Sequence, residues 1–194
     1  MPKEMTSTSR QMVRLGHTVA NGIDKAKFDF RGVIIGGGIA GILAGIVMAM
    51  VAMFYAAANG SGFFLPVRSI AATWYGANAL LGGAGVLIAG LATHLGTSAF
   101  GGVVFAALPS SRKSATVALL SGLVWGVVVW AILSIAVMPW LNPTMYAGTV
   151  GREPVWWFVL HLIYGGMLAI TPGLVCRVSA RWRGSPSPLQ RHAA

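Results

Sequence analysis

The stretch from Val33 to Ala56, VIIGGGIAGILAGIVMAMVAMFYA, carries no charged side chain and decides the class of fold. A helix needs about 20 consecutive apolar residues to cross the hydrocarbon core of a bilayer. Three more uncharged stretches of sufficient length follow, at residues 69–111, 114–151 and 154–176. We therefore predict an all-α polytopic membrane protein. Its four transmembrane helices, near residues 33–56, 80–106, 116–139 and 156–176, are expected to pack as a compact bundle.

The amino-acid composition excludes an ordinary soluble domain. Of the 194 residues, 56% are hydrophobic and 9% are charged, whereas a soluble domain carries roughly 25% charged residues. The net charge of +10 follows from basic residues that flank the spans, so it does not indicate a nucleic-acid partner. The single cysteine, Cys176, rules out an intrachain disulfide.

The basic residues predict the orientation of the chain. Lys and Arg accumulate in the cytoplasmic segments of membrane proteins. Twelve of the 14 lie in the N-terminal arm, in the loop between the second and third spans, and in the C-terminal tail. Only Arg68 and Arg152 fall in the other two loops. An even number of spans places both termini on one side, so we predict cytoplasmic N and C termini.

The two loops on the outer side are rich in aromatic residues. Trp74, Tyr75, Trp140 and Trp156 lie in or beside them. Tryptophan and tyrosine collect at the level of the lipid headgroups, so these side chains mark the outer boundary of the membrane. Residues 64–75 are expected to form a short helix in this interface.

The chain outside the spans forms an N-terminal arm, residues 1–31, and a C-terminal tail, residues 178–194, around a transmembrane domain at residues 32–177. In the arm, apolar residues recur at helical spacing, and Arg10, Arg14 and Lys25 lie on the opposite stripe. A basic amphipathic helix is expected on the anionic inner leaflet. Packing of the same helix on the cytoplasmic face of a partner is the alternative. The basic tail is predicted to be disordered.

Small residues form rows along the predicted spans. Each row places them four positions apart, which gives a helix one flat face. The glycines that we expect at helix contacts are Gly37, Gly41, Gly45, Gly122, Gly126 and Gly165. Because lipid is as apolar as leucine, membrane helices associate through close approach at such faces. Some of these faces are equally suited to oligomerisation or to a partner subunit.

Residues 36–41, Gly-Gly-Gly-Ile-Ala-Gly, match the G-x-G-x-x-G pattern of a dinucleotide site. That site needs a preceding strand, and an acidic residue about 20 positions later to bind the ribose. After Asp29 the next acidic residue is Glu153, and the apolar run continues through Phe54. We assign these glycines to helix packing rather than to a nucleotide.

His94 and His161 are the two histidines inside the predicted spans. Ionisable side chains in a membrane are costly and usually face protein. Three interpretations stay open: each imidazole forms a hydrogen bond within the bundle, the pair binds haem b or another cofactor, or the pair lines a proton or metal path. Depth speaks against a shared haem. His161 lies about 8 Å and His94 roughly 15–21 Å from the outer ends of their helices, at 1.5 Å per residue.

The predicted spans offer little for catalysis. They contain no carboxylate, and the chain has no HExxH motif and no cysteine cluster. We therefore expect a non-catalytic protein without a resident cofactor, acting as an accessory or scaffold subunit of a larger membrane complex. Its expected partners are the lipid bilayer and either membrane subunits or further copies of itself. A bis-histidine electron carrier and a small solute or ion pathway are the alternatives.

Several short phrases of the sequence resemble a known group of proteins. They are PVRSIAA at residues 66–72, residues 94–106, GLVWG at 122–126, Met138-Pro139 and HLIYG at 161–165. In these phrases the chain resembles the uncharacterised small four-helix inner-membrane proteins of bacteria, of the broadly YagU-like kind. The resemblance covers most of residues 33–170. It implies a bacterial inner membrane, no established activity and no catalytic residue.

Overall fold

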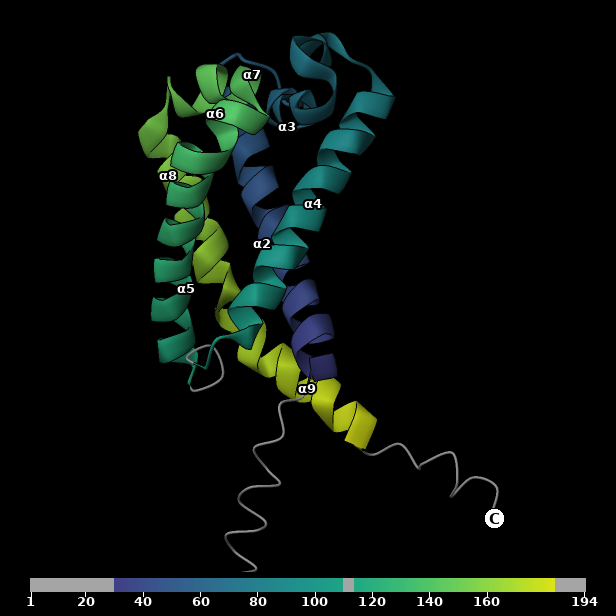
Figure 1. The fold of residues 1–194 in the computed structure, drawn as a ribbon, viewed down its shortest axis with the longest axis vertical. Helices are drawn as coiled ribbons and strands as arrows, with labels where there is room; N and C mark the ends of the chain where they lie inside the picture. The colour runs from purple at the N-terminus through teal and green to yellow at the C-terminus, as the bar shows by residue number, and fades with distance from the viewer. Residues whose placement is uncertain (1–29, 110–113, 184–194) are drawn as a thin grey trace, which may run out of the picture. The chain divides into compact units, whose positions relative to one another are not determined.

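The computed structural model describes residues 30–109 and 114–183, and every regular element in these two ranges is helical (Figure 1). Four helices are long and apolar enough to cross a membrane, namely Phe30–Ala58, Ala84–Ala107, Ala115–Leu141 and Pro154–Arg181. This confirms the prediction of an all-helical chain with four helices able to cross a membrane, and each predicted span overlaps one of these helices. Residues 1–29 of the N-terminal arm, which include Arg10, Arg14 and Lys25, lie outside the described residues, as does the tail from residue 184.

The first two crossings are α2 (Phe30–Ala58) and α4 (Ala84–Ala107). Between them lie α3 (Leu65–Tyr75) and a 3-10 segment, Gly76–Leu81. The short helix expected at residues 64–75 coincides with α3. Pro66 stands in its first turn, where a missing backbone N–H leaves no helical hydrogen bond unmade. α4 begins only at Ala84, after Gly82 and Gly83, so the second crossing is shorter than predicted.

The third crossing is α5 (Ala115–Ala131), which continues as a π-helical segment, Ile132–Val137, and then as α6 (Met138–Leu141). Ser114 caps the start of α5 by accepting a hydrogen bond from the Val117 amide at 3.3 Å. In the π-helical segment the Met138 amide donates to Leu133 O, five residues back. Pro139 follows at once and has no amide hydrogen to continue an ordinary helical pattern.

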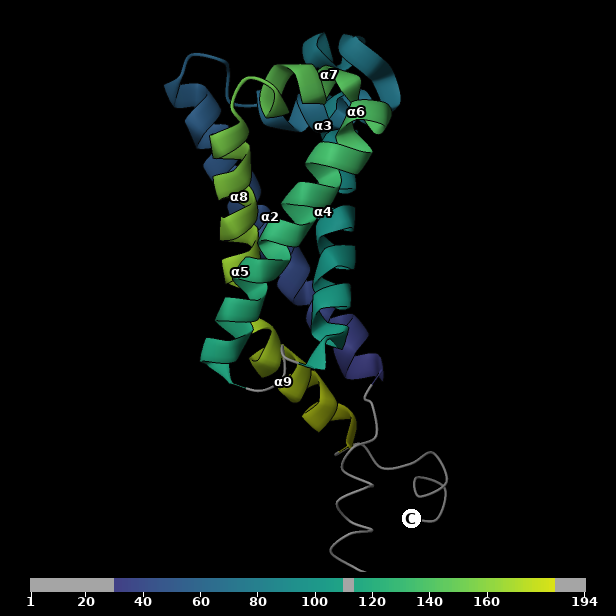
Figure 2. The ribbon, with the colours of Figure 1, turned by 60° about the vertical axis from the view of Figure 1, so that its left-hand side comes forward.

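The fourth crossing joins α8 (Pro154–Met167), a 3-10 turn (Leu168–Ile170) and α9 (Thr171–Arg183). At this turn Thr171 Oγ1 donates to Leu168 O at 2.6 Å, and Pro172 comes next. α9 leaves the direction of α8 there (Figures 1 and 2). The helix reaches Arg183, past residue 177 where we expected the transmembrane domain to end.

α3, α6 and α7 (Pro143–Met145) share one end of the crossings, which we name the loop end. Asn142 holds this end together and is fully buried. Its side-chain nitrogen donates to Ser69 O at 2.8 Å and to Thr73 Oγ1 at 3.0 Å, both in α3. Its side-chain oxygen accepts from the Met145 amide at 2.9 Å, which caps α7. One amide therefore ties α3 to the end of the third crossing.

Glycines bring α2 onto α4. A methyl group added at Gly41 would collide with Ser98 O, and one at Gly37 would lie 2.6 Å from Ala106 Cβ. One at Gly45 would lie 2.5 Å from Ser98 Oγ. The two backbones approach closely because these positions lack a side chain.

Glycines bring α5 onto α8 in the same way. Methyl groups at Gly122 and Gly165 would each meet the other's carbonyl oxygen, and one at Gly126 would meet His161 O. Gly166, the neighbour of Gly165, has only side-chain atoms nearby, the closest at 3.7 Å. All six glycines expected at helix contacts therefore lie against another helix.

α2 and α8 connect the two pairs. Tyr55 of α2 stacks on Trp156 of α8 with ring centroids 4.0 Å apart. Deeper in, Ala40 and Ala44 of α2 belong to one buried cluster with Leu160 and Leu168. The crossings thus neighbour one another in the order α4, α2, α8, α5. The candidate functional site lies on the remaining side, between α4 and α5.

Candidate functional site: a groove between α4 and α5

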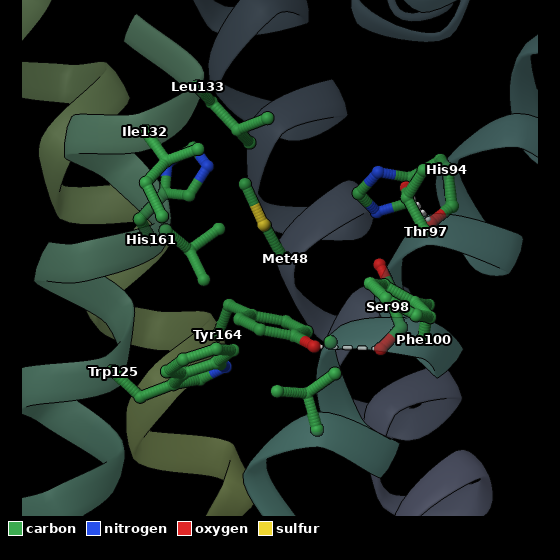
Figure 3. A pocket seen from close by; sticks show the side chains of 13 residues that line it. Met48, His94, Thr97, Ser98, Phe100, Trp125, Ile132, Leu133, His161 and Tyr164 are labelled. Atoms are coloured by element: carbon green, nitrogen blue, oxygen red, sulfur yellow. Dashed lines mark hydrogen bonds between the residues drawn. The ribbon is translucent and has the colours of Figure 1, made fainter. Parts of the chain in front are cut away.

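A cavity of about 430 Å³ lies between α4 and α5, with α2 and α8 behind it (Figure 3). We name it the α4/α5 groove. Its polar and aromatic lining is His94, Thr97, Ser98, Phe100, Trp125, His161 and Tyr164, and its remaining lining is apolar or glycine. The lining residues Phe100 and Ile132 are 72% and 51% exposed, so the groove opens sideways, where lipid surrounds a membrane protein.

His94 lies in the middle of α4. Its Nε2 is 2.9 Å from Gly45 O of α2. A carbonyl oxygen only accepts hydrogen bonds, so Nε2 carries the hydrogen and Nδ1 of the neutral ring keeps a lone pair. A methyl group at Gly45 would lie 3.6 Å from His94 Nε2, an ordinary contact distance, so the glycine is required by the Ser98 side chain rather than by the imidazole.

His161 of α8 is 2% exposed. Its Nδ1 is 2.8 Å from Trp157 O, one helical turn earlier, so Nδ1 carries the hydrogen and Nε2 keeps the lone pair. The Trp157 indole packs edge-on against the imidazole, with ring centroids 4.4 Å apart. Trp157 Nε1 in turn donates to Ser134 Oγ of the π-helical segment at 2.9 Å. The ring of His161 is thus held from two sides.

Tyr164 joins α8 to α4 at the lower part of the groove as drawn in Figure 3. Its hydroxyl donates to Ser98 O at 2.7 Å. Gly101 leaves space for this hydroxyl, since a methyl group there would lie 2.7 Å from it. Trp125 lies beside Tyr164 (Figure 3). The indole nitrogen of Trp125 is buried, and within the described residues it has no hydrogen-bond partner.

The structure brings both histidines to this one groove. They lie on opposite sides of the Met48 side chain (Figure 3). Their difference in depth is smaller than the sequence indicated, because α4 starts at Ala84 and α8 at Pro154. Counted from these residues, His94 lies about 15 Å and His161 about 10 Å along its helix. Depth therefore does not separate the two side chains.

Sequence reasoning missed Tyr164 and Met48 as lining residues. Tyr164 follows His161 by three positions, and residues so spaced share a face of a helix. That spacing was sufficient to place Tyr164 in any site that contains His161. Met48 is one of several methionines in an apolar run, and no signal distinguished it.

A second, smaller cavity of about 120 Å³ lies nearer the loop end. Tyr55, Glu153 and Trp156 line its part near the ends of α2 and α8. Met48 and His94 line it too, so these two side chains stand between the small cavity and the groove. A charged side chain at the end of the crossings is thus linked through one cavity to His94.

The part of the chain that the structure describes contains no assembled set of metal ligands. No group of three or more His, Cys, Asp or Glu side chains in residues 30–109 and 114–183 is arranged to hold an ion. No family model, curated protein or solved structure matches the chain. The atoms that line the groove therefore determine what it can bind.

Proposed function

We propose that the protein is a non-catalytic membrane protein that holds a membrane-soluble molecule in the α4/α5 groove and serves as an accessory or scaffold subunit of a larger membrane assembly. The groove carries this proposal, because it is apolar, opens towards lipid and contains two fixed histidines. None of its lining residues is a carboxylate, and a site without one lacks the usual acid and base of hydrolytic chemistry.

The scaffold role is supported by the surfaces of α4 and α5. In their most apolar windows only 17% of the residues are buried, compared with 50% in α2. A partner helix or a second copy of the chain has room to pack on these faces. The proposal includes one compact bundle of four helices, supported by the glycine contacts between α2 and α4 and between α5 and α8.

The proposed location is the bacterial inner membrane, with the loop end outside and both termini in the cytoplasm. Arg177 and Arg181 of α9 carry charge at the end opposite the loop end, in line with the positive-inside tendency. Trp74 and Trp140 at the loop end are 67% and 85% exposed, as an interfacial belt requires. The amphipathic arm would then lie on the inner leaflet, and the YagU-like resemblance points to the same membrane.

Native mass spectrometry of the full chain, released from its own membranes, tests both parts of this proposal. We expect a bound small molecule, a partner subunit or both. A protein that leaves the membrane as a bare monomer, with neither, would contradict the proposal.

A bis-histidine haem b site is the second candidate, favoured by the position of His94 and His161 on opposite sides of one groove. Each imidazole retains one nitrogen with a lone pair, which an axial ligand needs. An absorption spectrum of the purified protein tests for bound haem. The candidate requires a Soret band that disappears in both His94→Ala and His161→Ala, and it fails without one.

A small solute or ion pathway is the third candidate, favoured by the two cavities that share Met48 and His94. Flux of a solute or ion into proteoliposomes should then exceed flux into empty liposomes. It should also fall when Met48 is replaced by the bulkier Trp. Equal flux into both kinds of vesicle rejects this candidate for the solutes tested.

A further inference from the structure

The polar atoms of the α4/α5 groove are mostly hydrogen-bond acceptors. His94 and His161 each use their one N–H on a backbone carbonyl, Gly45 O and Trp157 O respectively. The second nitrogen of each ring has no partner among the described residues and can only accept. The two rings come from opposite walls of the groove, on either side of Met48 (Figure 3). A ligand with two separated hydrogen-bond donors can therefore bond to both of these nitrogens.

Besides these acceptors the groove offers two groups that can donate, the Ser98 hydroxyl and the Trp125 N–H, and two flat rings. The buried Trp125 N–H has no partner in residues 30–109 or 114–183. Tyr164 already donates to Ser98 O, so its hydroxyl has only acceptor capacity left. Trp125 and Tyr164 both line the groove, and Trp125 packs against the buried cluster that contains Tyr164 (Figure 3). Aromatic surfaces of this kind favour contact with another ring.

We propose that the α4/α5 groove binds a lipid-soluble hydroquinone, whose two ring hydroxyls donate to the free nitrogens of His94 and His161. This assignment rests on the proposed function of the groove as a binding site. One hydroxyl oxygen also accepts from Trp125 Nε1, and the ring packs on Trp125 and Tyr164. An apolar tail leaves between α4 and α5, past Phe100 and Ile132, into the lipid.

Size and charge agree with this ligand. Pockets for small molecules usually span about 300–1,000 Å³, and the groove measures about 430 Å³. No charged side chain lines it. A phosphate headgroup would therefore lose its hydration without gaining an opposite charge. A hydroquinone is neutral and loses far less on entry.

The test uses the full chain in phosphatidylcholine nanodiscs, under a reductant, with a radiolabelled hydroquinone that carries a ten-carbon tail. Protein-containing discs should retain more label than empty discs. The dimethyl ether of the same molecule keeps the ring and tail but has no donor. We expect it to compete at least tenfold more weakly than unlabelled hydroquinone. Equal competition by the ether would overturn the hydroquinone assignment without any variant.

Conservative variants test the individual atoms. His161→Asn keeps a nitrogen able to donate to Trp157 O but places no acceptor at the position of the imidazole Nε2. His94→Gln keeps a donor for Gly45 O but places no acceptor at the position of the imidazole Nδ1. We expect each to weaken hydroquinone binding about tenfold, which corresponds to about 1.4 kcal/mol. Trp125→Phe should weaken it severalfold. Its matched control is Trp130→Phe, since the Trp130 nitrogen is also buried without a partner in the described chain but does not line the groove. Unchanged affinity in both histidine variants would refute the assignment.

A blocking variant separates failure of the ligand class from failure of the groove. Val129 lines the groove, whereas Val128 lines another surface of α5. Val129→Trp should abolish retention of the hydroquinone, and Val128→Trp should leave it unchanged. If the ether and the hydroquinone bind equally and Val129→Trp removes both, the groove stands and the hydroquinone is wrong. If no discs retain either molecule above empty discs, both proposals fall.

Discussion

Buried polar side chains hold this protein together at a few defined points. Asn142 and Tyr164 each bond to backbone carbonyls of another crossing or of its connecting helix. The bonds matter because an unpaired polar group buried in protein or lipid costs more than the bond itself contributes. These residues are therefore the places where a single atom change should be measurable.

Replacing Asn142 with alanine should lower the free energy of unfolding by about 2–3 kcal/mol. The change removes the donor to Ser69 O and Thr73 Oγ1 and the acceptor for the Met145 amide. Detergent-induced unfolding, followed by tryptophan fluorescence, measures the loss. Asn78→Ala, at an exposed position of the same end, is the control and should change little.

Replacing Tyr164 with phenylalanine should cost about 1 kcal/mol, since it removes one bond between α8 and α4 and leaves Ser98 O without that donor. Tyr146→Phe is the matched control, because the Tyr146 ring is 38% exposed. A Tyr164→Phe protein as stable as the Tyr146→Phe protein would mean that this bond does not join the two helix pairs.

These residue roles were only partly predictable. Tyr164 shares a helix face with His161, so its place follows from spacing. The partner of Asn142 is 73 residues away, and no local pattern reports a contact of that kind. The meeting of His94 with His161 was also hidden, because it depends on where α4 starts, and the break at Gly82 and Gly83 shifted that start by four residues from the predicted residue 80.

At the scale of the elements, glycine spacing determines which helix faces touch. Gly41 lies directly against the backbone of Ser98, whereas Gly38, three residues earlier, has only Val103 Cγ2 near it, at 3.8 Å. Both glycines belong to the same run, and the four-residue spacing of Gly37, Gly41 and Gly45 separates Gly41 from Gly38. Hydropathy predicts that the helices exist, because the bilayer requires each span to be apolar. The contact faces additionally depend on how the helices cross.

Gly41→Ala and Gly38→Ala form a matched pair of tests. The added methyl group at Gly41 collides with Ser98 O and must push α2 from α4, so we expect a loss of about 2 kcal/mol in the free energy of unfolding. At Gly38 the methyl group meets no backbone, and the better helix propensity of alanine should make the change neutral or slightly stabilising. Detergent unfolding of both variants side by side provides the comparison. Equal losses would contradict the close contact at Gly41.

At the scale of the whole molecule, the distribution of charge predicts orientation, while the structure describes only the helices themselves. The proposed orientation can be tested by labelling in a Cys176→Ser background, since Cys176 is the chain's one cysteine and is exposed. Asn78→Cys, at the loop end, should react with a membrane-impermeant maleimide added to intact spheroplasts. Ala180→Cys, in α9, should react only after permeabilisation. The reverse pattern would place the loop end in the cytoplasm.

The position of α2 between α4 and α8 has a consequence for the order of assembly. Membrane helices insert individually and then associate, and the chain is made from its N-terminus. α2 therefore meets α4 while α8 has yet to be synthesised. Until then the buried cluster around Ala40 and Ala44 of α2 lacks the side chains that the fourth crossing contributes, Leu160, Tyr164 and Leu168. The α4/α5 groove comes into existence with this last insertion, so a ribosome-bound chain that ends before α8 has every wall of the site except the one that holds His161.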